Sequence, residues 1–450
     1  MTKPSRKLAP SWITVALASV LLSGCTVDIG TDEQFVDSGP RLVFDEYEVL
    51  FTNPVCRTYA YDEAVVSVSG EVLEQKPQHA FCYPSDSDAS GARPESPQHK
   101  LIEWIADPST EEIFFASMSF SNGAVQAALC DAVAERNVKV RFVLDSATSL
   151  DRANKLLACE PASGDPADAP ELQLRGHEGN ISLHHNKLFL LNPGAETMRI
   201  AFGSGNISSG LVLHHENWHF ITLPASTHFA QAHLCLMDGV LDHGHSKSEY
   251  SGFIRECKES IPAREEGDAK ALFVPGEGGR GANYIINAIR QADGIDILAH
   301  RFTHSTFVEQ FRRRLTGEAP PAVRLVVDDD MYWAGRGEVV GGNEPFEYDH
   351  VTTLTDVGME ARYVETNHPA HLLHHNKVMV FDMPSGRNDT VFCGADNFSK
   401  SAFKNNYENF YYISIPEVVE RYRQQYEHLY GDLATVAEDM PAENVIPSEG

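Results

Sequence analysis

One short pattern occurs twice in the chain and carries residues suited to chemistry on a phosphate diester. The tetrapeptide His-His-Asn-Lys at residues 184–187 returns 190 residues later at residues 374–377. In each copy a histidine and a lysine lie two residues apart on a predicted strand, so both side chains leave the same face. An imidazole can attack phosphorus or transfer a proton, and an ammonium group can bind phosphate oxygens. The pairs are His185 with Lys187 and His375 with Lys377.

Two further features follow each copy in nearly the same register. Ser204 and Asn206 lie in a Gly-Ser-Gly-Asn turn, and Asn397 lies in the corresponding Gly-Ala-Asp-Asn turn. Glu216 and Glu408 follow these asparagines by ten and eleven residues, respectively. Three features that keep register over such a distance indicate an internal duplication.

Two pseudo-symmetric halves packed face to face would bring these repeated residues into one site. The lysines and asparagines would hold the non-bridging oxygens and stabilise charge in the transition state. The two glutamates are placed to accept the Nδ1–H of each histidine and fix its tautomer. We expect no cofactor and no metal, because two histidines of opposite starting protonation supply both a nucleophile and an acid.

The segments that must position this site alternate between strands and helices. An apolar predicted strand at 112–120 is followed by a helix at 122–137 and a strand at 138–145. The second half repeats the alternation with predicted segments at 282–292, 295–300, 306–315 and 323–328. This order predicts an α/β fold of two pseudo-symmetric α/β/α lobes packed face to face around one active site.

The chain divides into six predicted segments. They are a signal peptide at 1–24, a tether at 25–44, an N-terminal lobe at 45–230, a connector at 231–264, a C-terminal lobe at 265–432 and an acidic tail at 433–450. We expect the tail to be disordered, because it is rich in Pro, Glu, Asp and Ala.

The N-terminus is typical of an exported protein. Basic residues precede an apolar run at 12–22 that is too short to span a membrane, which is the pattern of a signal peptide. Its Leu-Ser-Gly-Cys ending resembles the bacterial lipobox, which implies cleavage before Cys25 and lipid attachment to that residue. Thr26 after the cysteine resembles the pattern that sorts lipoproteins to the outer membrane. We therefore expect a lipid-anchored protein of the bacterial cell envelope, on a periplasmic or surface face.

The charge balance restricts the partners. The chain has 450 residues and a formal net charge of −28, from 36 basic and 64 acidic residues. Such acidity argues against a general nucleic-acid binder, which needs lysines and arginines to displace counterions. Hydrophobic residues make up 42% of the chain, which excludes global disorder. We expect a monomer that meets a phospholipid substrate and is attached to the membrane by its lipid anchor.

Seven cysteines remain besides Cys25. An exported chain permits disulfides. Sequence neighbours suggest the pairs 56–82, 130–159 and 235–257, with Cys393 left on a buried strand. Connectivity does not follow from sequence alone. No Cys-x-x-Cys pair is present, so a structural zinc site is not expected.

The duplicated pattern resembles the signature of the phospholipase D (HKD) superfamily, His-x-Lys-x4-Asp followed by Gly-Ser/Gly-x-Asn. The second copy matches the first part through Asp382, and the first copy has Asn192 at that position. The first copy retains the motif serine at Ser204, and the second copy has Ala395 there. The resemblance covers most of 100–432.

The resemblance implies roles for these residues. The N-terminal copy supplies the nucleophile, here His185, and His375 is the acid and base; the reverse assignment stays open. The motif Asp is structural, so Asn192 would weaken a scaffold contact, and Ser204 would help orient or hydrogen-bond the phosphate or its neighbours. The implied activity is metal-independent phosphodiester hydrolysis or transfer on phospholipids.

Two alternatives remain. One is an exported endonuclease of the same superfamily, which would need a basic cleft; the only basic run of the mature chain, residues 312–314, is interpreted as a solvated helix face. The other is a catalytically weak scaffold that acts as a surface binding protein. We interpret His184 and His374 as structural hydrogen-bonding residues, and residues 328–330 as a solvated turn rather than a cation site.

Overall fold

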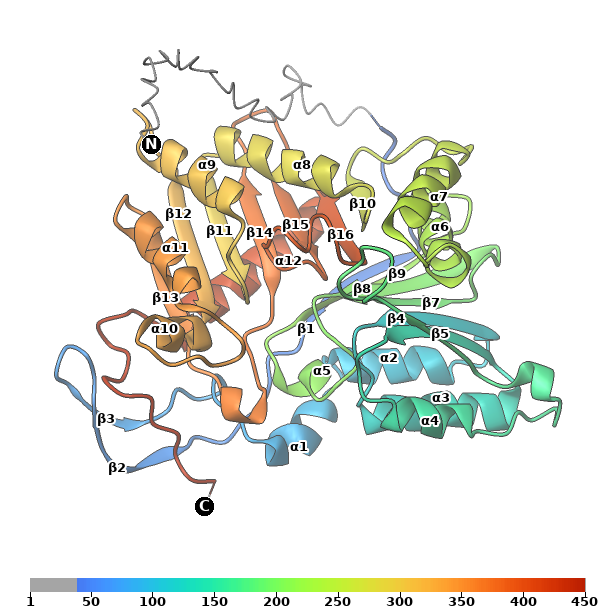
Figure 1. Cartoon of the computed structure of the whole chain (residues 1–450), viewed down its shortest axis with the longest axis horizontal. Coiled ribbons are helices and arrows are strands. Elements are labelled where there is room, and N and C mark those ends of the chain that lie inside the picture. The colour runs from blue at the N-terminus through green and yellow to red at the C-terminus, as the bar shows by residue number, and fades with distance from the viewer. Residues whose placement is uncertain (1–38, 450) are drawn as a thin grey trace, which may run out of the picture. The chain divides into compact units, whose positions relative to one another are not determined.

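The computed structural model describes residues 39–449, which include both copies of the motif. The predicted signal peptide, Cys25 and most of the tether lie outside the described residues. Two large sheets with helices on their faces form the framework (Figure 1). Within the described residues no helix is long and apolar enough to cross a membrane.

The first sheet has seven strands in the order β1-β9-β8-β7-β4-β5-β6. Strands β4, β5 and β6 run parallel, and the other neighbours pair antiparallel. In spatial order the strands are β1 (Glu46–Phe51), β9 (Asn217–Pro224), β8 (Thr197–Gly203), β7 (Lys187–Leu191), β4 (Glu112–Ser117), β5 (Lys139–Asp145) and β6 (Glu171–Arg175).

The second sheet repeats this topology strand for strand and adds one short strand at its edge. Its order is β10-β16-β15-β14-β11-β12-β13-β17, with β11, β12 and β13 parallel. The strands are β10 (Ala269–Val274), β16 (Glu408–Ile413), β15 (Thr390–Gly394), β14 (Lys377–Asp382), β11 (Gly294–Ala299), β12 (Ala322–Asp328), β13 (Glu360–Val364) and β17 (Ala434–Thr435). The shared strand order confirms the two-lobed α/β fold that the repeated motif predicts.

Helices flank both sheets. In the first half they are α1 (Ser87–Gly91), α2 (Pro97–Ala106), α3 (Gly123–Arg136), α4 (Asp151–Leu157), α5 (Gly210–Leu213), α6 (His228–Asp242) and α7 (Lys247–Glu259). In the second half they are α8 (Gly278–Gln291), α9 (Ser305–Leu315), α10 (Asp329–Gly335), α11 (Pro345–Thr355) and α12 (Pro416–His428). The predicted helix at 122–137 and strand at 138–145 agree with α3 and β5 to within a residue, whereas α8 begins four residues before its prediction.

The two halves share one continuous core. Its buried apolar residues come from both sheets, and the rings of Phe202 on β8 and Tyr411 on β16 stack with centroids 3.6 Å apart. A helix that follows the last main strand of each half packs against the other half. On α6, His233 packs against Phe273 of β10, and on α12, Tyr422 packs against Phe51 of β1. The halves therefore bury their apolar faces against each other, which holds the strand ends of the two sheets in fixed register.

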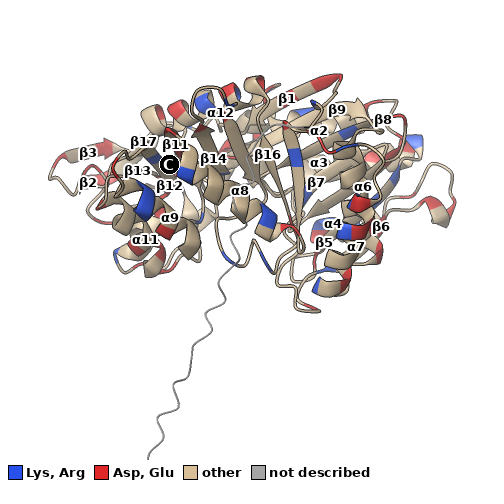
Figure 2. Cartoon of the chain, turned by 90° about the horizontal axis from the view of Figure 1, so that it is seen from above, with Lys and Arg blue, Asp and Glu red and all other residues tan. Residues whose placement is uncertain are grey.

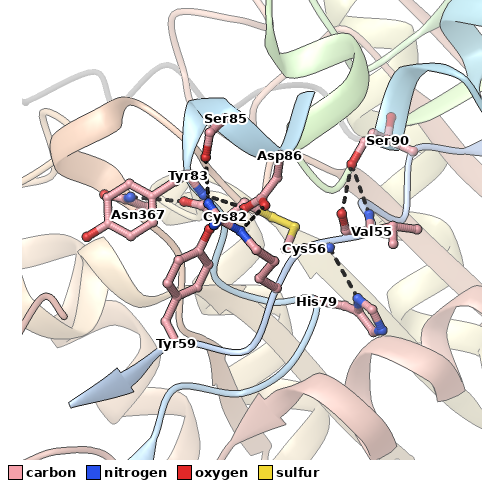
Figure 3. Close-up of a disulfide and its surroundings, with 12 residues drawn as sticks. Val55, Cys56, Tyr59, His79, Cys82, Tyr83, Ser85, Asp86, Ser90 and Asn367 are labelled. Atoms are coloured by element: carbon pink, nitrogen blue, oxygen red, sulfur yellow. Dashed lines mark hydrogen bonds and ion pairs between the residues drawn. A yellow bond between two sulfur atoms is a disulfide. The ribbon is translucent and has the colours of Figure 1, made fainter. Parts of the chain in front are cut away.

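The segment between β1 and α2 packs against the second half. It contains a small hairpin, β2 (Ala60–Val66) with β3 (Val72–Gln75), and the disulfide Cys56–Cys82 (Figure 3). Asn367, beyond β13, donates to the carbonyl oxygen of Cys82 at 2.9 Å. The other predicted pairs, Cys130–Cys159 and Cys235–Cys257, are also present, and Cys393 is a free thiol buried on β15.

The acidic tail is ordered, which corrects the prediction of disorder. After β17 the chain returns along the β2–β3 hairpin, where the Val68 N–H donates to the Met440 carbonyl at 2.8 Å and the Ala442 N–H donates to the Val66 carbonyl at 2.9 Å. Met440 is fully buried. Backbone pairing to a hairpin edge and one buried side chain order the segment, and neither feature shows in its acidic composition.

Candidate active site

Each motif loop is joined by a backbone hydrogen bond to the segment before the motif glutamate of the other half. The His185 N–H donates to the Tyr407 carbonyl at 2.9 Å, and the His375 N–H donates to the His215 carbonyl at 3.0 Å. Tyr407 and His215 each lie one residue before a motif glutamate, Glu408 or Glu216. Each histidine of one half is therefore placed against the glutamate of the other half.

The glutamates hold the histidines crosswise. His185 Nδ1 lies 2.7 Å from Glu408 Oε2, and His375 Nδ1 lies 2.8 Å from Glu216 Oε1. Because a carboxylate only accepts, each Nδ1 carries the proton and each Nε2 is left with a lone pair for chemistry. The sequence predicted that the glutamates hold the histidines, and the structure adds that the partners come from opposite halves.

The two motif lysines, each two residues after its histidine, are fully buried. Lys187 Nζ donates to the His185 carbonyl at 2.9 Å, and Lys377 Nζ donates to the His375 carbonyl at 2.6 Å and the Ser204 carbonyl at 3.2 Å. Burial lowers the pKa of Lys187 to about 8 and holds the pKa of Lys377 well below its ordinary value. An arriving phosphate would stabilise both ammonium groups and raise these pKa values.

The histidines and lysines of both halves lie within electrostatic reach of one another. Burial lowers the pKa of His185, and burial together with the positive charge of Lys377 holds the pKa of His375 well below its ordinary value. The charges of Lys187 and His185 act on His375 in the same direction. The side chains of His185 and His375 are only 6% and 8% exposed, so both imidazoles belong to one buried site.

Asn206 and Asn397 follow β8 and β15 at corresponding places. The residues after them, Ile207 and Phe398, bridge to Phe120 and Phe302 just beyond the ends of β4 and β11. Both asparagines are half-buried, and within the described residues their Oδ1 atoms accept no hydrogen bond. The structure thus gives the two predicted phosphate-binding amides equivalent positions in the two halves.

Ser204 and its replacement explain how each glutamate is held. Ser204 Oγ donates to Glu216 Oε2 at 2.6 Å and accepts from the Asn217 N–H at 3.0 Å. Ala395 offers no hydroxyl, and in its half the Asn406 amide donates to Glu408 Oε1 at 2.9 Å instead. The serine therefore positions a glutamate of the site, and Asn406 supplies the corresponding contact in the other half.

The Asn192 departure does not weaken the scaffold as the sequence predicted. Asn192 Oδ1 accepts from the Glu111 and Glu112 N–H groups at 2.8 and 3.2 Å, and its amide donates to the Ser109 carbonyl at 2.7 Å. Its φ of 53° is a left-handed conformation that asparagine tolerates. Asp382 ends β14, at the opposite end from Lys377, and pairs with Arg423 at 2.5 Å. Both residues are scaffold groups outside the reacting centre.

Sequence reasoning missed two buried aspartates that hold the motif loops. Asp145, at the end of β5, accepts from the His184 N–H at 2.7 Å, and Asp328, at the end of β12, accepts from the His374 N–H. Asp328, Asp329 and Asp330 are fully buried at the start of α10, which corrects the prediction of a solvated turn. Burial raises the pKa of Asp328 to about 6. Asp328 ends β12, a buried parallel strand next to β11, and this position is the sequence signal that predicts burial. The run of three carboxylates hid that signal, because such a run suggests exposure to solvent.

The rings of His184 and His374 do not play the predicted hydrogen-bonding role. Among the described residues neither ring nitrogen of either has a hydrogen-bond partner, and the contacts to Asp145 and Asp328 come from their backbones. Burial lowers the pKa of His184 to about 3, so this ring is neutral at physiological pH.

Three further buried groups lie at the site, and each has a different residue at the corresponding position of the other half. His300 follows β11, with its ring centroid 4.8 Å from that of His375, and His214 Nδ1 lies 3.3 Å from Glu216 Oε1. Asp396 is buried where the first half has Gly205, and burial raises its pKa well above the ordinary value. The strand pairings place Met118 opposite His300 in the repeat, and the motif register places Asn406 opposite His214. The two halves therefore give their histidines different surroundings.

Comparisons with known proteins show what the chain is similar to. A family model described as the PLD-like domain of cardiolipin synthase matches residues 285–430. No curated protein matches the sequence. A phosphatidylserine synthase from Haemophilus influenzae Rd KW20 is similar in structure, with a TM-score of 0.51 and 13% identity over 76% of this chain and 85% of that chain.

Two other solved structures are similar to parts of the chain. A polyphosphate kinase from Porphyromonas gingivalis has a TM-score of 0.50 and 15% identity, and the match covers 77% of this chain but only 48% of the kinase, so this chain spans about half of that protein. Nuc from Salmonella typhimurium, a phospholipase D family member, is 22% identical over 37% of this chain and 96% of its own, with a TM-score of 0.29. The family match therefore shows a PLD-like domain in the second half, at residues 285–430, and the first half repeats the strand order and the motif of that half.

Proposed function

We propose that the chain is a phospholipase D-type phosphodiesterase that acts on phospholipids through a phosphohistidine intermediate. The observation that carries the proposal is the crosswise pairing of His185 with Glu408 and of His375 with Glu216. This pairing leaves two Nε2 lone pairs in a single buried site that also contains two lysines. A site with two imidazoles of this kind suits a double displacement at phosphorus.

In the proposed mechanism, His185 Nε2 attacks phosphorus and His375 protonates the oxygen of the departing alcohol. His375 then takes a proton from a water molecule, and the resulting hydroxide displaces the phosphate from His185. Lys187, Lys377 and the two asparagine amides stabilise the oxygens as their charge grows. The anionic substrate raises the pKa of His375, which lets this buried ring carry the proton that it must donate.

Several observations favour a phospholipid over a nucleic acid. The net charge is −28, and on α9 Arg312 and Arg313 both pair with Glu309, at 2.9 and 2.6 Å. Figure 2 shows Lys and Arg interspersed with Asp and Glu in the view from above. The matched family description also names a phospholipid synthase domain. We further propose that a lipid on Cys25 anchors the chain in the bacterial envelope, beside its substrate.

The test is a paired assay on the full chain in detergent, with EDTA present. One tube receives vesicles of phosphatidylcholine and phosphatidylglycerol, and the other receives plasmid DNA. Head-group release that His185→Ala and His375→Ala each abolish, and that the His243→Ala control retains, supports the proposal. DNA cleavage without lipid turnover would contradict it and favour a nuclease. No turnover of either by the folded protein would favour a binding role.

A further inference from the structure

Three buried donor atoms from both halves converge beside the active site. They are His214 Nδ1, Glu216 Oε1 and His375 Nδ1, which all lie within 4.8 Å of one another. Glu216 Oε1 is 3.3 Å from His214 Nδ1 and 2.8 Å from His375 Nδ1. His214 and Glu216 come from the turn before β9, and His375 comes from the turn before β14, so the strand framework fixes the cluster.

The hydrogen bonds of His214 leave a lone pair aimed at a carboxylate. Its Nε2 lies 2.7 Å from the His371 carbonyl, which only accepts, so Nε2 carries the proton of the neutral ring. Nδ1 then presents its lone pair to Glu216 Oε1 and makes no hydrogen bond to any described residue. His214 is only 8% exposed, so bulk water screens this contact poorly. The lone pair of Nδ1 and the carboxylate oxygen repel each other, and a cation placed between the two atoms would be coordinated by both.

The donor set and its spacing suit zinc. Zinc binds imidazole nitrogen and carboxylate oxygen at about 2.0–2.2 Å, so the ligand atoms of a tetrahedral site lie roughly 3.3 Å apart. The two contacts of Glu216 Oε1, at 3.3 and 2.8 Å, lie near this value. Two histidines and a glutamate leave a fourth position for water.

The repeat provides an internal comparison. In the other half Glu408 and His185 correspond to Glu216 and His375, but Asn406 occupies the place of His214 and donates its amide to Glu408. An amide group that donates a hydrogen bond offers no lone pair to a soft cation. The three donors therefore meet on one side of the pseudo-symmetric site, and the corresponding place on the other side lacks the third donor.

We propose that His214, Glu216 and His375 form a binding site for a divalent transition-metal ion such as zinc, and that metal binding switches off the phosphodiesterase. Ligation through Nδ1 moves the ring proton of His375 to Nε2, with no net change in the protons bound to that ring. An Nε2 that carries a proton, on a ring whose Nδ1 is bound to a cation, cannot take a proton from water. The inhibitory part of the proposal rests on the proposed function, whereas the binding site does not.

Nearby charges set the strength of the site. The positive charges of Lys187 and Lys377 repel an added metal ion, and the negative charges of Glu216 and Glu408 offset this repulsion. The ion must also displace the existing Nδ1–H contact between His375 and Glu216. The affinity is therefore expected to be weaker than that of a structural zinc site, as suits a reversible regulator.

The test is a titration of ZnCl2 into the full chain, solubilised in detergent, free of any histidine tag and stripped with EDTA. Calorimetry should show one bound zinc per chain, and His214→Asn, which installs the residue of the other half, should weaken binding at least tenfold. His214→Gln is the second variant in case the first does not fold, as judged by circular dichroism. His243→Asn, at a half-buried histidine that stacks on Phe253 and is not one of the three donors, should bind zinc like the unmodified chain.

Three results would overturn the metal site: no binding by the unmodified chain, undiminished binding by both folded His214 variants, or equal weakening in His243→Asn. Cobalt substitution adds a spectroscopic check, because tetrahedral nitrogen and oxygen ligation should give visible bands that disappear in His214→Asn. Lipid turnover by the EDTA-treated chain that zinc abolishes supports the inhibitory part. Zinc binding by a chain that turns over no lipid in EDTA would contradict the proposed function and leave the metal site standing.

Discussion

Each motif histidine owes its tautomer to a carboxylate that the other half of the chain supplies. Glu408 holds His185, Glu216 holds His375, and each glutamate is held in turn by a different device, Asn406 or Ser204. Neither half alone contains both a motif histidine and the glutamate that orients it. The chemistry therefore depends on contacts that exist only when both halves have docked.

The first prediction at this scale concerns the charge of these glutamates. Glu408→Gln and Glu216→Gln keep the size of the side chain but remove the charge that stabilises an imidazolium during proton transfer, and each should lower kcat by about 10²-fold. Steady-state turnover of phosphatidylcholine vesicles measures the effect. Glu309→Gln on the exposed face of α9 is the matched control. A kcat within threefold of the unmodified chain for both variants would contradict the assigned role.

The second prediction concerns the substitute for the missing serine. Asn406→Ala leaves Glu408 Oε1 without its amide donor, and the loss of a buried hydrogen bond to a charged group should destabilise the fold by about 1.5–3 kcal/mol. Ala395→Ser in the same background should restore part of this free energy, because a hydroxyl at that position holds Glu216 in the other half. Urea denaturation measures both changes. No loss in Asn406→Ala, or no recovery in the double variant, would contradict this explanation.

At the scale of elements, the strand ends place the site and a peripheral segment holds the second half to the first. Lys187 and Lys377 begin β7 and β14, and Asp145 and Asp328 end β5 and β12, so both motif loops lie at the same edge of equivalent sheets. The segment that carries β2 and β3 is fixed to the end of β13 by a fully buried ion pair between Lys76 and Glu365.

This buried pair gives a third prediction. Burial raises the pKa of Glu365 and the charge of Lys76 lowers it, so each charge depends on the other. Lys76→Met should destabilise the protein by about 3–5 kcal/mol, because it leaves a buried carboxylate without a partner. Lys76→Met combined with Glu365→Leu should recover most of that loss, since no charge then remains buried. Chemical denaturation of the single and double variants decides; a double variant as unstable as the single one would refute the argument.

Some of these elements follow from the sequence and others do not. The duplicated tetrapeptide and the strands around it are predictable, because apolar runs and a repeated spacing indicate them. The pairing of the three disulfides was only suggested by sequence neighbours, and the structure confirms it. The crosswise partners of His185 and His375 are not, because a repeat of equal halves does not say which glutamate meets which histidine. The burial of residues 328–330 was missed because three adjacent carboxylates usually indicate solvent.

At the scale of the whole molecule, a large set of buried neutral histidines links folding to pH. Burial lowers the pKa of His184, His215, His219 and His233 to about 3. All four have less than 2% of their surface exposed. In the unfolded chain these rings take up protons near pH 6.5, whereas in the folded chain they do not. Acid therefore favours the unfolded state.

The fourth prediction follows from this difference. The free energy of unfolding should be nearly constant, as far as these groups are concerned, above pH 6.5 and should fall as the pH decreases from 6.5 toward 3. At pH 5 the loss amounts to about 2 kcal/mol for each such histidine. Urea midpoints at pH 7 and pH 5, with the disulfides intact, measure it, and His233→Gln should reduce the difference. Equal midpoints at the two pH values would contradict the assignment of these rings as buried and neutral.

The central claim is that His185 and His375 act together in one active site on a phosphodiester. The most direct test is to trap the intermediate in His375→Ala with a short-chain phosphatidyl ester of p-nitrophenol, whose leaving group departs without protonation, by rapid quenching and mass spectrometry of the peptides. The account predicts a phosphatidyl adduct on the peptide that contains His185, because the intermediate forms but its hydrolysis lacks a base. His185→Ala should show no adduct. An adduct on His375 in that variant would reverse the two roles, and lipid turnover with no adduct on either histidine would contradict the claim.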